Sequence, residues 1–231
     1  MNSRRPIRHL RTALPAGFLL ISMLLCGCQK AYYETMEVFG RHKRDILVDD
    51  VKEARDAQNE AKEQFASALE EFSAVVNFSG GDLEENYDTL NAAYKRSRSK
   101  AEAVRGRIDD IKRVANALFD EWEEELQLYT SDSLREASER RLRQTRQRYA
   151  RLIEAMENAV SKIQPVLSAF QDQVLFFYFY LNDQAVASLQ DELITVENEI
   201  EILIREMERS IEEADAFIQQ MTRPNGLTER Y

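Results

Sequence analysis

The residue types that usually carry catalysis are scarce in this sequence. Histidine occurs only at positions 9 and 42, and a catalytic histidine needs a partner group that the basic stretch around His42 does not offer. Gly80-Gly81 is not followed by the Lys-Ser or Lys-Thr of a phosphate-binding loop. No Glu-x-x-His pair is present to hold a di-iron centre. The sequence therefore predicts no catalytic residue, no metal site and no cofactor, and we expect a protein that is not an enzyme.

The thiol of Cys28 is the side chain with the clearest predicted chemical role. It closes the stretch Leu25-Cys26-Gly27-Cys28, which follows an apolar run over residues 14–25 and a basic front with arginines at positions 4, 5, 8 and 11. A basic front, a short apolar region and a small residue before the cut are typical of a secretory signal peptide. Cys26 is less suitable because bulky apolar residues precede it. We interpret Cys28 as the residue that becomes the N-terminus and is lipidated, as in bacterial lipoproteins.

This interpretation predicts where the protein resides. Stable membrane attachment needs more than one acyl chain, and the likeness to lipoproteins implies a diacylated sulfur and an acylated amine on Cys28. Gln29 follows the cysteine, whereas an aspartate typically retains lipoproteins in the inner membrane of enteric bacteria. We expect the periplasmic face of the outer membrane, with the inner membrane as the weaker alternative. An uncleaved N-terminal anchor helix is the other reading, although the apolar run is short for a membrane span.

Composition limits what the rest of the chain can do. Without the four leader arginines, 27 basic residues remain against 41 acidic ones, a net charge of −14. Such a chain repels nucleic acid in general. No cysteine follows Cys28, so no disulfide can form in an oxidising compartment. The abundance of Glu, Ala, Arg, Leu and Gln, together with few glycines and prolines, is typical of long helices or coiled coils.

Rare helix-breaking residues mark the turns. Asp82 with Glu85 and Ser133 with Glu136 have the spacing of a capping box, Asn182-Asp183 favours a helix start, and Pro224 and Gly226 stop the last helix. We predict helices over residues 34–78, 83–129, 133–181 and 183–221. The domains are then a signal peptide (1–27), a lipid-anchored linker (28–33), a four-helix coiled-coil domain (34–221) and a flexible tail (222–231).

Apolar residues recur every 3.5 positions within these segments, which is the heptad pattern of helices packed side by side. Short links make neighbouring helices antiparallel. The sequence predicts an all-α, elongated antiparallel bundle, either as one bundle or as two hairpins, with a kink in the third helix at Pro165. The predicted stripes are Leu47, Val51, Ala54, Gln58, Ala61, Phe65, Ala68, Phe72 and Val75; Tyr87, Leu90, Tyr94, Ser97, Ala101, Val104, Ile108, Ile111, Ala115, Leu118 and Trp122; Tyr149, Leu152, Met156, Val160, Ile163, Leu167, Phe170, Val174, Phe177 and Leu181; and Leu189, Leu193, Val196, Ile200, Leu203, Met207, Ile211, Ala214, Ile218 and Met221.

Arginines crowd the start of the third predicted helix. They form a basic patch that suits anionic headgroups or cell-wall polymer, or they pair with carboxylates on the second helix, which is the favoured interpretation for a surface charge run. The expected partners are Asp109, Asp110, Asp120, Glu121 and Glu124. The arginines are Arg135, Arg140, Arg141, Arg143, Arg146, Arg148 and Arg151.

An aromatic run near the third turn is the most unusual feature. Its members are Phe176, Phe177, Tyr178, Phe179 and Tyr180. Five consecutive helical positions sweep more than a full turn, so they cannot all face one core. The run is either a plug that closes the bundle end, which we favour slightly, or an exposed contact tip, since large exposed apolar patches mark partner or membrane sites. It is far too short to span a membrane.

Several blocks resemble one protein family. The opening residues 32–37 and 40–49, together with residues 65–69, 119–123 and 172–175, are similar to an uncharacterised Gram-negative coiled-coil lipoprotein family that is catalogued as a domain of unknown function. The resemblance covers nearly all of the chain after Cys28. It implies a helical fold and an envelope location, and it implies no activity.

Together these observations favour a lipid-anchored helical spacer or docking module in the cell envelope. The expected partners are the membrane, through Cys28, and an envelope protein or cell-wall polymer; an open apolar stripe would also allow a homo-oligomer. The alternative is a membrane-active protein that inserts its aromatic run, residues 176–180, into a bilayer. A reaction that used only surface carboxylates is the weakest class, because groups outside a shaped pocket lack tuned pKa values.

Overall fold

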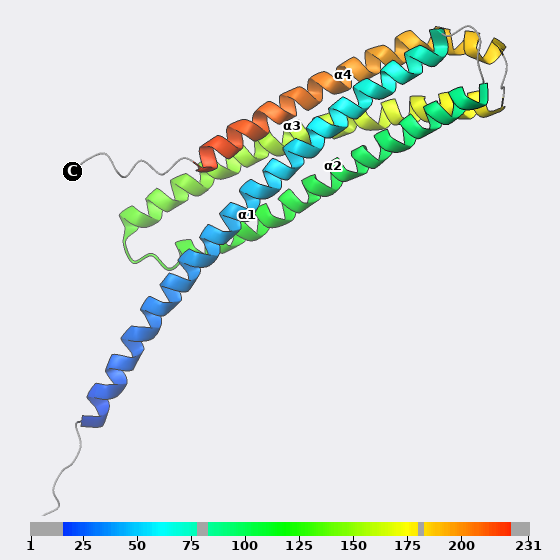
Figure 1. Ribbon diagram of the computed structural model, residues 1–231. Coiled ribbons are helices and arrows are strands. Elements are labelled where there is room, and N and C mark those ends of the chain that lie inside the picture. The colour runs from blue at the N-terminus through cyan, green and yellow to red at the C-terminus, as the bar shows by residue number, and fades with distance from the viewer. Residues whose placement is uncertain (1–15, 78–82, 180–182, 223–231) are drawn as a thin grey trace, which may run out of the picture. The chain divides into compact units, whose positions relative to one another are not determined.

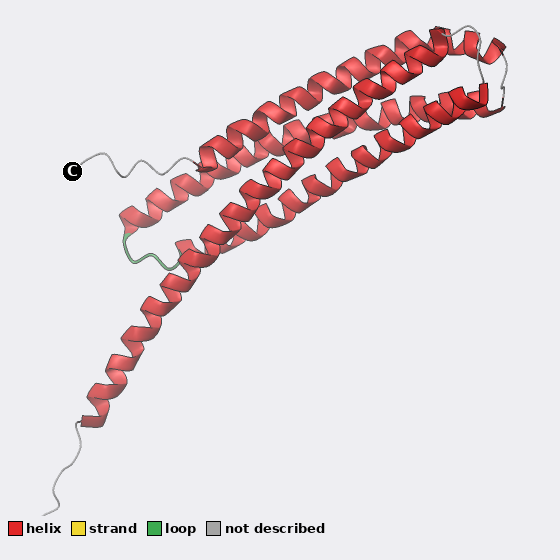
Figure 2. Ribbon diagram, viewed as in Figure 1, coloured by secondary structure: helices red, strands yellow, loops and turns green. Residues whose placement is uncertain are grey.

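The computed structural model describes the backbone of residues 16–77, 83–179 and 183–222, and the side chains of residues 42–76, 83–179 and 192–222. These ranges hold four α-helices and no strand, as Figure 1 and Figure 2 show: α1 (Ala16–Asn77), α2 (Leu83–Leu126), α3 (Asp132–Phe179) and α4 (Asp183–Thr222). The all-α prediction is confirmed. The chain divides into two units, Met1–His42 and Lys43–Tyr231, so α1 begins in the first unit and continues through the second.

Several helix starts and ends differ from the predicted ones. α1 begins at Ala16 instead of residue 34, because the leucines, methionines and alanines of the expected leader and linker are themselves good helix formers. α2 ends at Leu126, where the amides of Gln127 and Leu128 bond to carbonyls three residues back and tighten the last turn. The glycine turn, Leu181 with Asn182 and the tail from residue 223 lie outside the described residues.

The third helix begins earlier than the predicted capping box. The amide of Arg135 donates to the carbonyl of Ser131 at 3.0 Å, which makes Ser131 the N-cap and leaves Ser133 inside the first turn. Asp132 opens the helix, where its carboxylate favours the positive end of the helix dipole. The prediction of Ser133 as the cap is therefore wrong by two residues, and the hydroxyl groups of Ser131 and Ser133 instead bond to each other at 3.0 Å.

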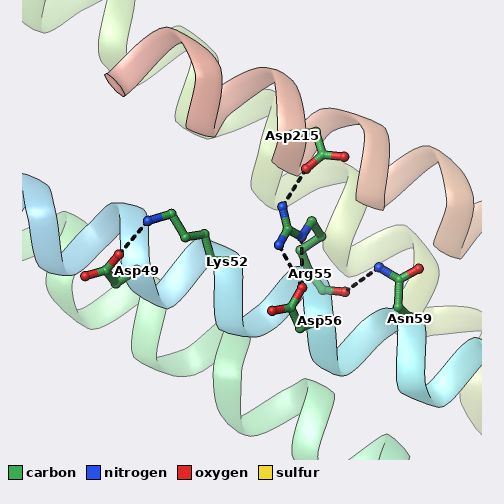
Figure 3. A network of polar contacts seen from close by, with 6 residues as sticks. All are labelled: Asp49, Lys52, Arg55, Asp56, Asn59 and Asp215. Carbon is green, nitrogen blue, oxygen red and sulfur yellow. Dashed lines mark hydrogen bonds and ion pairs between the residues drawn. The ribbon is translucent and has the colours of Figure 1, made fainter. Parts of the chain in front are cut away.

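The helices of the second unit enclose one core. Ion pairs join α1 to α2 through Lys100 and Glu60 at 2.6 Å, and α1 to α4 through Arg55 and Asp215 at 2.9 Å (Figure 3). α3 contacts both α2 and α4. The partners run in opposite residue order along each seam, so neighbouring helices are antiparallel. The four helices thus form one up-down-up-down bundle and not two separate hairpins (Figure 1).

Aromatic rings also pack across the centre of this bundle. Phe72 of α1 and Phe170 of α3 have ring centroids 6.3 Å apart, which places the two diagonal helices in contact through the core. Both residues belong to predicted stripes. The end of α1, the start of α2, the end of α3 and the start of α4 therefore lie at the same end of the bundle, which we call the turn end.

The heptad stripe predicts most of the core of α1, although Val48 and Val76 beside it are buried as well. All nine stripe residues from Leu47 to Val75 are buried. In α4 the prediction fails at four described positions, because Leu193, Ile211, Ile218 and Met221 are only half-buried. Ser210 and Phe217 are buried in place of Ile211 and Ile218. In the structure, the buried positions of α4 keep the alternating spacing of four and three residues through Ser210. The prediction chose Ile211 instead, because an apolar isoleucine stands next to the polar serine.

Three polar side chains are fully buried in this otherwise apolar core: Gln58, Ser97 and Ser210. Within the part of the chain that the structure describes, both amide atoms of Gln58 and both serine hydroxyls lack a hydrogen-bond partner. A buried polar group without a partner costs about 1–3 kcal/mol. Each of these positions therefore lowers the stability of the core.

α3 passes through Pro165 without a break in the helix. The proline has no amide hydrogen, so the carbonyl of Ser161 lacks its usual intrahelical donor. Beside it, Gln164 accepts a hydrogen bond from Arg105 of α2 at 3.3 Å and donates one to Ser168 at 3.3 Å. These contacts hold the proline turn against α2, and the predicted kink angle stays a prediction.

Candidate functional site

The aromatic run divides between the core and the surface at the end of α3. Phe177 is completely buried, whereas Tyr178 is 55% exposed and Phe179 is 73% exposed. Phe176 is also exposed, and Tyr180 lies outside the described residues. The buried residue and the exposed residues thus belong to one run, because Phe177 is the only described member of the run that lies on the heptad stripe of α3.

A second helix contributes to this exposed surface. Tyr87 of α2 lies against Tyr178 with ring centroids 5.4 Å apart, and Tyr178 packs edge-on against Phe179 at 5.3 Å. Leu175 is 46% exposed beside them. We call this set the aromatic surface: Tyr87, Leu175, Phe176, Tyr178 and Phe179. Sequence reasoning missed Tyr87 and Leu175, although the place of Tyr87 in the stripe of α2 was a usable signal.

Carboxylates surround the turn end. An open groove of about 690 Å³ follows the α1–α2 seam, and it is lined by Glu71, Glu84, Glu85, Asp88, Thr89, Ala92 and Arg96. Arg96 is the one cation among the described lining residues, and it binds both carboxylate oxygens of Glu71 at 2.6 and 2.8 Å. The groove is shallow and strongly acidic, which suits a charged partner surface better than an enclosed small molecule.

The arginines of α3 pair mostly within their own helix. Arg135 contacts Asp132, Arg140 contacts Glu136 and Arg143 contacts Glu139, at 2.7–3.7 Å. The prediction that these arginines form ion pairs with carboxylates therefore holds for these three residues, but the predicted partners on α2 are wrong. Carboxylates one turn away on α3 are nearer than most of those across the α2–α3 seam.

Among the residues that the structure describes, one arginine of this segment reaches across to α2 with an ion pair. Arg146 binds Glu123 at 2.6 Å and also lies over the ring of Phe119. Among the described residues, no ion pair joins these arginines to Asp109, Asp110, Asp120, Glu121 or Glu124. Three arginines of the segment form no ion pair within the described part of the chain: Arg141, Arg148 and Arg151. Arg141 and Arg151 are exposed, and Arg148 is half-buried. These three residues are what remains of the proposed basic patch.

The opposite end of the bundle, where α1 enters the second unit, is held by polar and cation–π contacts. Arg44 lies 4.3 Å above the ring of Trp122, whose indole N–H donates to Ser138 at 2.8 Å. Burial lowers the pKa of Arg44 from its ordinary value. Burial likewise raises the pKa of Tyr129, whose hydroxyl donates to Glu125 at 2.7 Å. These contacts stabilise the end of the bundle.

The described residues contain no group of three or more His, Cys, Asp or Glu side chains arranged to hold a metal ion. His42 is exposed. None of the described helices combines the length and hydropathy needed for a membrane span. The side chain of Cys28 lies outside the described residues, so its lipidation stays a prediction.

The comparison with family models bears on the resemblance seen in the sequence. Residues 32–221 match a model described as "Protein of unknown function (DUF2959)". A comparison with curated proteins finds no match. The matched region covers most of the chain and includes nearly all of the four-helix bundle. The chain therefore belongs to the DUF2959 family.

Proposed function

We propose that the protein is a lipid-tethered, non-catalytic docking module on the periplasmic face of the outer membrane. Its bundle serves as a spacer that holds the aromatic surface away from the tether. The aromatic surface carries the proposal, because it is an exposed apolar patch on a rigid bundle end and such patches mark interaction sites.

The two ends of the bundle support a spacer role. Lys43, where the second unit begins, pairs with Glu121 near the end of α2 at 2.9 Å. The aromatic surface lies at the turn end, on the far ends of the same helices. α2, α3 and α4 have 44, 48 and 40 residues, so each is on the order of 60–70 Å long at 1.5 Å per residue. A tether joined at one end can thus present a contact surface at the other.

A membrane-active role is the second candidate, since exposed tyrosine and phenylalanine side chains also favour bilayer interfaces. Phe177 cannot serve it, because that side chain is completely buried. Only Tyr178, Phe179 and their exposed neighbours remain for insertion. The acidic surroundings of these residues oppose contact with anionic lipid headgroups, so we place this role second.

The tether is tested by fractionation of cells that express the full chain. Cys28→Ser is expected to move the protein from the membrane pellet into the soluble fraction or to leave it as an unprocessed precursor of higher mass, since no thiol remains to carry the acyl chains. Immunoblots of the two fractions, with mass spectrometry of the wild-type N-terminus, give the readout.

Cys26→Ser is the matched control, because it removes a thiol two residues away and should leave both processing and membrane attachment unchanged. The proposal fails if Cys28→Ser remains processed and membrane-bound, or if both substitutions release the protein equally.

A further inference from the structure

The charge of the chain is divided unevenly along its length. Residues 63–94 and 163–204 contain fourteen Asp or Glu and no Lys, Arg or His. After Cys28 the remaining residues hold 27 acidic and 27 basic side chains, so the net charge of −14 comes entirely from these two stretches. Composition alone does not reveal this division, because the basic and acidic totals are spread over the whole sequence.

The fold brings the two stretches together. The first covers the end of α1 and the start of α2, and the second covers the end of α3 and the start of α4. The contacts Phe72–Phe170 and Tyr87–Tyr178 show that both belong to the turn end. The aromatic surface therefore lies on two chain stretches that carry acidic side chains and no basic ones.

Individual carboxylates lie close to the aromatic surface in the sequence. Asp172 is exposed and precedes Phe176 and Phe179 by four and seven positions, so the three share one face of α3. Asp88 is exposed next to Tyr87 on α2. Aromatic faces flanked by carboxylates bind Lys and Arg side chains through cation–π contacts and charge pairing together.

We infer that the aromatic surface docks a cationic, amphipathic segment of another protein, a partner class that rests on the docking role proposed above. Apolar side chains of that segment cover the exposed rings, and its Lys or Arg residues pair with the surrounding carboxylates. The negative potential speeds encounter with such a segment and repels anionic surfaces.

Other possible occupants of the aromatic surface agree less well with these observations. An anionic bilayer meets like charge at this end. The tail after Thr222 begins at the opposite end of α4, whose 40 residues are about 60 Å long, whereas nine extended residues reach at most about 32 Å. A second copy that brings its α3 arginines to this surface needs an antiparallel two-fold dimer, and the self-association measurement below tests for it.

The test uses the purified full chain and a fluorescent fifteen-residue helical peptide of lysine and leucine as the probe. Fluorescence anisotropy should show saturable binding that weakens with added salt, whereas the peptide with glutamate in place of lysine should not bind. Tyr178→Ser with Phe179→Ser should weaken binding by about ten-fold or more, as expected when interface anchors are lost.

Charge variants separate local pairing from net charge. Asp88→Asn with Asp172→Asn should weaken binding several-fold and flatten the salt dependence. Asp109→Asn with Asp120→Asn removes the same charge from the balanced part of the bundle, where both residues are exposed, and should leave binding unchanged.

Three outcomes overturn the inference: equal binding of the acidic peptide, equal loss in both charge variants, or preferential binding of vesicles that contain anionic lipid. Concentration-dependent self-association that Tyr178→Ser with Phe179→Ser abolishes also overturns it in favour of a second copy. If membrane attachment depends on Cys28 but the cationic peptide does not bind, only this partner class is wrong. If membrane attachment does not depend on Cys28, the proposed function itself is wrong.

Discussion

Phe177→Ser is expected to lower the free energy of unfolding by about 4 kcal/mol, enough to lower the midpoint of thermal unfolding by roughly 10 °C in a chain of this size. Phe177 is completely buried and belongs to the contiguous core, so serine leaves a cavity and buries a hydroxyl. Phe→Ala substitutions at such sites cost about 3–5 kcal/mol. Urea denaturation followed by circular dichroism at the helical band measures the change.

Phe179→Ser is the matched control in the same aromatic run. Its side chain is 73% exposed, so the substitution should change the free energy of unfolding by no more than about 0.5 kcal/mol. Similar losses from the two variants would contradict the division of the run into a core residue and a surface residue. That result would also contradict the proposed docking surface, because docking requires the side chain of Phe179 to be accessible.

Gln58→Leu is expected to raise the free energy of unfolding by about 2 kcal/mol. Gln58 is fully buried, and neither amide atom has a hydrogen-bond partner among the described residues. Leucine has a comparable size and removes the cost of an unpaired buried amide, about 1–3 kcal/mol. Thermal and urea unfolding should both move to higher midpoints.

Gln147→Leu on α3 is the control, because Gln147 is exposed and its replacement removes no buried polar group. It should leave stability within about 0.5 kcal/mol of the wild type. Lower stability of Gln58→Leu would contradict the reading of Gln58 as an unsatisfied group. A polar residue in a heptad core commonly fixes register at a cost in stability, so the variant also deserves a test of its oligomeric state.

The fold follows closely from the sequence because one rule governs most of it. An apolar residue every 3.5 positions places Leu47, Phe65 and Val75 on one face of α1, and all nine residues of that predicted stripe are buried. In α4, Ser210 and Phe217 escaped prediction because Ile211 and Ile218 stand beside them. Apolar residues flanking the core on adjacent positions make the stripe ambiguous, and only packing decides which of them faces inward.

The surface contacts were less predictable. Arg140 and Arg143 pair with glutamates four residues earlier on α3, whereas Arg146 reaches Glu123 of α2. Long flexible side chains at exposed positions choose among several carboxylates of nearly equal energy, since exposed ion pairs contribute only about 0–1 kcal/mol. Sequence spacing therefore predicts that such residues pair, but not with which partner.

The candidate site was partly visible in the sequence. The aromatic run was recognisable, and the place of Phe177 in the heptad stripe indicated that it alone points into the core. The contribution of Tyr87 depends on how α2 packs beside α3, which spacing within one helix does not determine. The negative turn end likewise needs the topology, because its carboxylates come from segments about a hundred residues apart.

Site-specific photocrosslinking in intact cells tests the central claim most directly. A benzophenone amino acid in place of Phe179 of the membrane-bound protein should yield one discrete protein adduct whose crosslinked segment is rich in Lys and Arg, and the same probe in place of Gln147 should not. Adducts with lipid alone at position 179, or the same pattern at both positions, would contradict the account of a tethered bundle that docks a partner through its aromatic surface.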